Sequence, residues 1–407
     1  MVKRRAVAGC LAALAAQAGA AEFNAAFTVA PEIDTPNTAS PYYVGPPLVP
    51  GRGSRQDLEL RLRDGGFNAQ GTLRWQAAQD RKPEQHGIAN QFYYDGELAE
   101  GLGWTAGKKI MSWGVGFGFK PLDVVQRENR RAVNPPALVG TPVLALERFT
   151  ADEAWTVAWT HPGQGEGVDD FHDASLALRW YRLAASGDDL HAVARVSHRR
   201  GFEAGVGATR VIGTDWSLYG AALYERRTRR LVNALTQAGG VLAPSDPMAE
   251  STGGGGMKTV AGAQWTGESG WSLLMEAWYD ADAYSREQWQ RLDALTAGQR
   301  ALAGIAPAAA VAGNAAWSSQ AYLSPNLLRG NLLARLGYDD RDGFRPYVEL
   351  LATPSDGGLV ATAGASFEGN RQRFTVGLRQ AGGASGSAYA RAPIRRAAWA
   401  EWRVALF

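Results

Sequence analysis

Apolar and polar side chains alternate along most of the chain beyond its first 21 residues, in segments of roughly ten residues. Between residues 67 and 77, Leu73 and Trp75 occupy one set of alternate positions, and Arg74 and Gln76 occupy the other. Successive side chains of a β-strand point to opposite faces, so this pattern predicts strands with one apolar face and one polar or small face. The expected strands cover 22–31, 54–63, 66–78, 88–99, 102–113, 143–149, 154–161, 173–183, 190–199, 201–211, 215–226, 257–266, 270–280, 317–338, 343–353, 358–368, 371–381 and 396–407.

The gaps between these strands alternate in length. The short gaps lie at 64–66, 99–101, 151–153, 185–189, 213–214, 266–270, 339–342 and 368–370, and the long ones at 32–53, 79–87, 114–142, 162–172, 227–256, 281–316 and 382–395. A closed bacterial outer-membrane barrel has short periplasmic turns and long extracellular loops, whereas a soluble sandwich has no reason to sort its loops in this way.

We therefore expect an all-β fold, a single closed antiparallel transmembrane β-barrel of about eighteen strands, with both ends of the chain on the periplasmic side. Sixteen strands is the alternative count, because the pattern is weakest at 22–31, 143–149 and 317–338. No run of 18 apolar residues occurs beyond the first 21, which excludes helical membrane spans. The 49 Gly, 14 Trp and 13 Tyr fit a protein rich in turns and interfacial aromatic rings.

The two ends of the chain carry signals of export and assembly. Residues 1–21 combine a basic start, an apolar stretch and the small residues of a cleavage site, so we expect a signal peptide there and the barrel at 22–407. Cys10 is the only cysteine, so the mature chain should hold neither disulfides nor thiolate metal sites. The chain ends in Phe407, which resembles the C-terminal signature of Gram-negative outer-membrane proteins that the barrel-assembly machinery recognises.

Two long loops also carry helical patterns. Ser285 followed by Gln288 forms a capping box before a helix-like spacing of apolar residues. The stretch 229–238 is a second short helix candidate, because Gly239 and Gly240 follow it as a stop signal. Either helix could cap the mouth of the barrel or decorate its surface.

The polar faces of the strands are rich in arginine. Rings of arginine in a water-filled pore favour anions, but barrel interiors also hold arginine–carboxylate ladders that only satisfy buried charge. Both interpretations stay open from the sequence. The candidate pore-lining residues are Arg61, Arg63, Arg74, Lys108, Lys109, Arg195, Arg329, Arg335, Arg345, Arg373 and Arg379.

The segment from Gly107 to Gly114, with the basic pair Lys108 and Lys109 followed by Trp113, resembles a recurrent motif of the alginate-export-type channel family and related porin-like barrels. This resemblance implies an outer-membrane channel for a polar or anionic oligosaccharide or small solute, with Lys108 or Lys109 facing the pore.

The next loop, 115–141, is unusually long for a compact domain. Loops of this length are functional or disordered, and in porin-like barrels such a loop often folds inward to narrow the pore. We expect a constriction formed by Arg127, Arg130 and Arg131, with an exposed loop as the alternative.

A barrel of this size leaves a channel unless it is plugged. We therefore expect an outer-membrane porin for passive transport of polar, anionic small solutes or oligosaccharides, working without cofactor or metal, surrounded by outer-membrane lipids and lipopolysaccharide. The alternatives are a barrel enzyme and a plugged or anchoring barrel. The densest candidate cluster for an enzyme comprises His161, Asp169, Asp170, His172 and Asp173, and the chain carries no hydrolase or metalloprotease motif. The net charge of +2 gives nucleic-acid binding no support.

Overall fold

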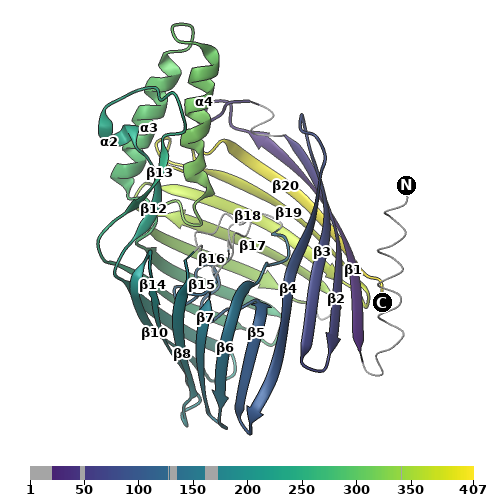
Figure 1. Cartoon of the computed structure of the whole chain (residues 1–407). Coiled ribbons are helices and arrows are strands. Elements are labelled where there is room, and N and C mark those ends of the chain that lie inside the picture. Colours follow the sequence, from purple (N-terminus) through teal and green to yellow (C-terminus); the bar gives the residue numbers. More distant parts are fainter. Residues whose placement is uncertain (1–20, 46–50, 127, 129–134, 161–172, 341) are drawn as a thin grey trace, which may run out of the picture.

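Eighteen antiparallel strands form one closed barrel (Figure 1). The computed structural model describes residues 21–45, 51–126, 128, 135–160, 173–340 and 342–407. Each strand pairs with its neighbours along the chain, and β1 pairs with both β2 and β20, which closes the sheet on itself. No helix in these ranges is long and apolar enough to cross a membrane.

The strands of the barrel are β1 (Glu22–Pro36), β2 (Arg52–Asp64), β3 (Phe67–Ala78), β4 (Glu84–Ala99), β5 (Leu102–Lys109), β6 (Thr141–Phe149), β7 (Glu153–Thr160), β8 (Ser175–Leu183), β9 (Asp189–Ser197), β10 (Gly201–Ile212), β11 (Trp216–Glu225), β14 (Gly256–Thr266), β15 (Trp271–Asp280), β16 (Gly330–Tyr338), β17 (Phe344–Thr353), β18 (Gly358–Glu368), β19 (Gln372–Gly383) and β20 (Ile394–Ala405). All eighteen expected strands are present, and the eight short gaps are the eight turns at one end of the barrel. The expected fold class and strand count are confirmed.

Three expected elements are corrected. The strand expected at 317–338 begins only at Gly330, because 308–319 is an alanine-rich helix that runs on into a short 3₁₀ turn at 320–323. The strand expected at 102–113 ends at Lys109, since the next amides donate to side chains instead of to a neighbouring strand. Of the helix expected at 229–238, only the last turn forms.

The outer face of the barrel is an apolar belt. Its side chains alternate with inward-facing ones along every strand, and their exposure in a single chain is what a lipid-facing surface requires. Large members of this belt are Leu144, Leu146, Val157, Trp159, Leu176, Val196, Val206, Met275, Leu332, Val348, Leu350 and Leu378.

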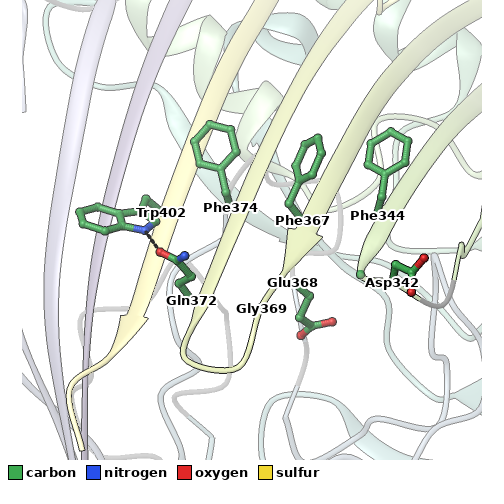
Figure 2. A pocket seen from close by; sticks show the side chains of 9 residues that line it. Asp342, Phe344, Phe367, Glu368, Gly369, Gln372, Phe374 and Trp402 are labelled. Atoms are coloured by element: carbon green, nitrogen blue, oxygen red, sulfur yellow. Dashed lines mark hydrogen bonds between the residues drawn. The ribbon is translucent and has the colours of Figure 1, made fainter.

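Aromatic rings mark the end of the belt near the short turns. Figure 2 shows Phe344, Phe367, Phe374 and Trp402 side by side on the successive strands β17 to β20, around a shallow hollow of the outer face. The Phe344 and Phe367 rings are 4.8 Å apart, and the indole of Trp402 donates to Gln372. Such a row is the interfacial girdle of a membrane barrel, here at its periplasmic rim.

The extracellular end carries the remaining elements. The hairpin β12 (Arg229–Asn233) and β13 (Met248–Thr252), the one-turn helix α2 (Leu235–Ala238) and the helices α3 (Arg286–Ala301) and α4 (Ala308–Ser319) rise above the strands (Figure 1). Ser285 caps α3, and its capping box with Gln288 is confirmed. Trp289 of α3 packs against Tyr42 of the β1–β2 loop and against Tyr322, at ring distances of 6.4 and 5.0 Å.

Candidate solute pore

The inner face of the barrel has two unlike halves. On β6 to β11 many inward positions carry small or apolar side chains, next to buried charged ones such as Arg195 and Glu203, although a water-filled lumen would favour exposed polar side chains there. The small and apolar positions are buried, so something other than water covers them. They are Val143, Ala145, Ala158, Ala177, Val193, Ala221 and Leu223.

Residues 110–126, which we call the inward segment, cover this apolar half. The Leu122 side chain is 0% exposed and lies against β10. A Cβ atom on Gly205 or Gly207 would come within 2.7 or 2.9 Å of Leu122, so only glycine at these two positions leaves room for it. The small residues of the wall therefore form the seat of the inward segment, and its burial supplies apolar stabilisation inside the barrel.

The carboxylate of Asp123 holds the base of the inward segment together. It accepts hydrogen bonds from the backbone amides of Trp113 and Gly114, at 2.6 and 2.5 Å, and from the Ser112 hydroxyl. Burial raises the pKa of Asp123 above its ordinary value, while Lys120 and the donated hydrogen bonds lower it in part. Asp123 thus joins the start of the inward segment, residues 112–114 just after β5, to its later part around residue 123.

Glu276 of β15 holds the tip of the inward segment on the far wall. Its carboxylate is 3% exposed and accepts from the amides of Phe117, Gly118 and Phe119 at 2.7, 2.9 and 3.0 Å. The hydroxyl of Tyr219 donates to the same carboxylate at 2.6 Å. A buried carboxylate with four donors is fully satisfied, so the segment is bound at both ends across β6 to β15.

One arginine of the barrel wall lies beside the tip of the inward segment and faces the lumen. The guanidinium of Arg335 on β16 lies 5.3 Å from the ring centre of Phe117 and 3.8 Å from that of Tyr347. Glu349 accepts from it at 3.4 Å, and the Arg335 side chain remains 32% exposed. Cation–π contacts on both sides hold this charge in place beside the segment.

The other half of the inner face, from β16 through β20 and β1 to β5, is a charged wall of alternating arginines and carboxylates. The ion pairs on it include Arg55–Asp57, Arg55–Glu401, Arg74–Asp57, Lys109–Asp95, Arg335–Glu349, Arg345–Asp339, Arg345–Glu368, Arg373–Glu401 and Arg403–Glu59. Most of its positive charge is thus matched by a neighbouring carboxylate, as in a structural ladder.

Two arginines of the charged wall bind neutral partners instead. Arg61 donates to the amide oxygen of Gln70 at 3.1 Å, and Arg63 donates to that of Asn68 at 2.9 Å. Both side chains are exposed, near the periplasmic end of β2. An amide partner leaves the guanidinium charge unneutralised, so these two residues give the wall a local positive field.

Most of the basic residues expected in the pore lie on the inner face. Arg379 is among them and donates to Thr362 on β18. The register and the side-chain partners place on this face Arg61, Arg63, Arg74, Lys109, Arg335, Arg345, Arg373 and Arg379.

Three expected pore residues lie elsewhere. Lys108 pairs in register with Phe92, which is 59% exposed on the outer face, so Lys108 points away from the lumen. Arg195 faces inward but is 1% exposed, bound to Ser175 and Glu203 under the inward segment. Arg329 precedes β16 at the extracellular rim and donates to the carbonyl of Ala283.

The constriction expected from Arg127, Arg130 and Arg131 lies outside the described residues, as do residues 1–20 of the signal peptide expected at 1–21 and the histidines at 161 and 172. In the described ranges no three His, Cys, Asp or Glu side chains gather so as to hold a metal ion.

The alternation of polar and apolar positions does not reveal that Glu276 and Asp123 anchor the inward segment. Small residues at the inward positions of β7, β8 and β10, such as Ala158, Ala177 and Gly205, are the signal that could have revealed the seat.

No protein-family model and no curated protein matches this chain. Solved structures do resemble it. OccK11 (OpdR) of Pseudomonas aeruginosa superimposes with a TM-score of 0.53 at 8% identity, covering 95% of this chain and 96% of that one. OccAB2 of Acinetobacter baumannii gives 0.51 at 8% identity, over 94% and 98%. Wzi of Escherichia coli, an outer-membrane carbohydrate-binding β-barrel involved in group 1 capsule assembly, gives 0.50 at 11% identity, over 93% and 84%.

At these identities the likeness is one of fold. The resemblance to alginate-export-type channels stays a prediction, because no family model supports it. A closed barrel, an apolar belt and aromatic rings at the rim are together the features of an outer-membrane protein. The chain forms an eighteen-stranded porin-like β-barrel of the Gram-negative outer membrane.

Proposed function

We propose that this barrel is a channel through which small polar solutes diffuse, with a preference for anions. The observation that carries the proposal is the division of the inner face. The inward segment is seated on the apolar half, and the charged wall is left to line the passage, with Arg61 and Arg63 bound only to neutral amides. Field strength from such unneutralised arginines favours anions without binding them tightly.

The other arginines contribute little net field, because carboxylates pair with most of them. Arg335 differs from these paired arginines. It lies beside the inward segment, and the rings of Phe117 and Tyr347 contact its guanidinium in addition to the carboxylate of Glu349. We therefore expect modest selectivity, set by Arg61, Arg63 and Arg335 rather than by the whole ladder.

Planar-bilayer recordings of the purified barrel test this proposal. In a gradient of potassium chloride, the reversal potential should indicate chloride preference, and the double variant R61Q/R63Q should shift it toward the cation side. Arg182→Gln is the matched control, because this arginine lies at the periplasmic end of β8 on the outer face. A cation preference of the wild type, or equal reversal potentials of R61Q/R63Q and R182Q, would contradict the arginine argument.

The proposal that the channel also passes an oligosaccharide rests on the resemblance of residues 107–114 to a motif of alginate-export-type channels. Lys109 supports it in one respect, since its ammonium lies over the Tyr93 ring at 4.9 Å and beside Asp95, which is a polar and aromatic surface suited to sugars. Swelling of proteoliposomes in neutral and in acidic disaccharides of equal size separates the two solute classes. Faster entry of the acidic sugar is the expected result.

A closed binding barrel is the second candidate, and the extracellular cap favours it. Tyr42 donates to Asp293 of α3 at 2.6 Å, and Arg391 of the β19–β20 loop approaches the same carboxylate at 3.3 Å. The β1–β2, β15–β16 and β19–β20 loops are thereby joined above the strands. An absence of conductance together with retention on immobilised polysaccharide would favour this candidate, in line with the carbohydrate binding described for Wzi.

A further inference from the structure

The basic residues around the extracellular ends of β9 to β11 are sorted by face. Those that point inward are buried and paired. Arg200 and Lys258 each approach the carboxylates of Glu225 and Asp282, at 2.6 to 2.8 Å. These buried charges fix the extracellular loops to the barrel wall.

The remaining basic residues of this region are exposed. Arg199 lies in the β9–β10 turn, and Arg226 and Arg227 follow β11 directly. None of these three guanidinium groups lies within 4.0 Å of a carboxylate in the part of the chain that the structure describes. The nearby acids Glu203 and Glu225 face inward and are 0% exposed, so they leave the outer rim positively charged.

These arginines stand directly above the lipid-facing belt. Arg226 continues the ladder of β11, because its amide donates to the carbonyl of Phe202, and it lies two residues beyond Tyr224. Phe202 and Tyr224 are the last large side chains of the belt on these strands, each 45% exposed. Since a strand rises about 3.4 Å per residue, Arg226 sits roughly 7 Å beyond Tyr224 on β11 and opposite Phe202 on β10, at the edge of the belt where lipid headgroups begin.

We propose that Arg199, Arg226 and Arg227, the rim cluster, bind the phosphate groups of a phosphorylated glycolipid in the outer leaflet, that is, lipopolysaccharide. The guanidinium fork matches phosphate oxygens in pairs, and the exposed rings of Phe202 beside Arg226 and of Tyr224 below it suit contact with the acyl chains. Arg226 continues the outward positions of β11, and Arg227 reaches over to the β9–β10 turn, where it donates to the carbonyl of His198, so this binding does not depend on what the channel passes.

The test compares the full barrel in nanodiscs that contain diphosphorylated lipid A with the same barrel in nanodiscs that contain dephosphorylated lipid A. Binding of the phosphorylated glycolipid, measured by native mass spectrometry, should fall in the double variant R226Q/R227Q. A basic residue at a charged lipid surface contributes about 1 kcal/mol, or about fivefold, so the double variant should bind roughly 25-fold more weakly. Added salt should reduce the difference, because it screens exposed charges.

R148Q/R182Q is the matched control, since it removes two exposed outer-face arginines at the periplasmic ends of β6 and β8. It should bind as the wild type does, and the thermal midpoints of both variants should equal that of the wild type. Equal affinity of the wild type for the two forms of lipid A would overturn the proposal. So would equal binding by R226Q/R227Q and R148Q/R182Q.

Discussion

Glu276→Gln should release the tip of the inward segment. The carboxylate oxygen Oε2 accepts from the Phe117 amide and the Tyr219 hydroxyl, and Oε1 accepts from Gly118 and Phe119. The amide NH₂ of glutamine cannot accept a hydrogen bond, so at least one buried backbone donor loses its partner and the others lose a charged acceptor.

The cost can be estimated from these contacts. A hydrogen bond to a charged group contributes about 1.5–3 kcal/mol, so loss of the two bonds to one oxygen costs roughly 3–6 kcal/mol. Each 1.4 kcal/mol is a tenfold change in an equilibrium, so the population with a detached tip should rise by at least about a hundredfold. Leu122 and the Asp123 contacts lie nearer the base and should keep the rest of the segment seated.

Single-channel recording is the assay. E276Q should show larger current steps and frequent transitions between levels, while the wild type stays at one smaller level. Tyr219→Phe removes one of the four bonds and should give an intermediate frequency. The matched control is Glu59→Gln, which removes a carboxylate from the charged wall, where its partner is Arg403. If E276Q and E59Q give identical traces, Glu276 does not hold a constriction and the reasoning fails.

Three further predictions follow from the same contacts. Leu122→Ala should lower the free energy of unfolding by about 2–5 kcal/mol, measured by urea titration in detergent, because the seat on β10 cannot close around the smaller side chain. Trp289→Ala should make the cap protease-sensitive without changing the barrel's heat-modifiable gel shift, because its ring packs against Tyr42, Tyr284 and Tyr322 and its indole donates to the carbonyl of Leu327, all in the extracellular loops. Burial raises the pKa of Asp293 above its ordinary 3.8, so the folded protein keeps this proton to a higher pH than the unfolded chain does. The free energy of unfolding should therefore decrease as the pH rises through the window between the two pKa values, and the thermal midpoint of the wild type should fall relative to that of D293N. A difference in midpoint that stays constant with pH would contradict the raised pKa.

The fold could be predicted from the sequence because alternation and loop length are local properties of the chain. A strand of a membrane barrel must keep one face apolar along its whole length, as β8 does with Leu176, Leu178 and Trp180. The helix α4 escaped this rule because an alanine-rich stretch has no clear periodicity, and 308–316 could be taken as loop.

The site was harder to predict because its key contacts join residues far apart in sequence. Nothing near Glu276 indicates that three amides at 117–119 lie against it, since the distance in sequence is about 159 residues. Lys108 shows a second limit. The pair Lys108–Lys109 must place one residue on each face, and only the register with β4 decides which of them faces the lumen.

The two halves of the inner face explain each other. On β6 to β11 the buried carboxylates Glu203 and Glu225 are held in ion pairs, and alanine and glycine beside them leave a dry groove that Leu122 fills. Once the segment occupies that groove, the opposite wall is left to line the lumen, where arginines can stay partly exposed without cost to packing. The environment of each inward position therefore depends on whether the inward segment or the lumen covers it. The strand pattern shows only that Arg195 faces inward, and for this reason it predicted a pore-lining residue where the structure has an arginine buried beside Glu203.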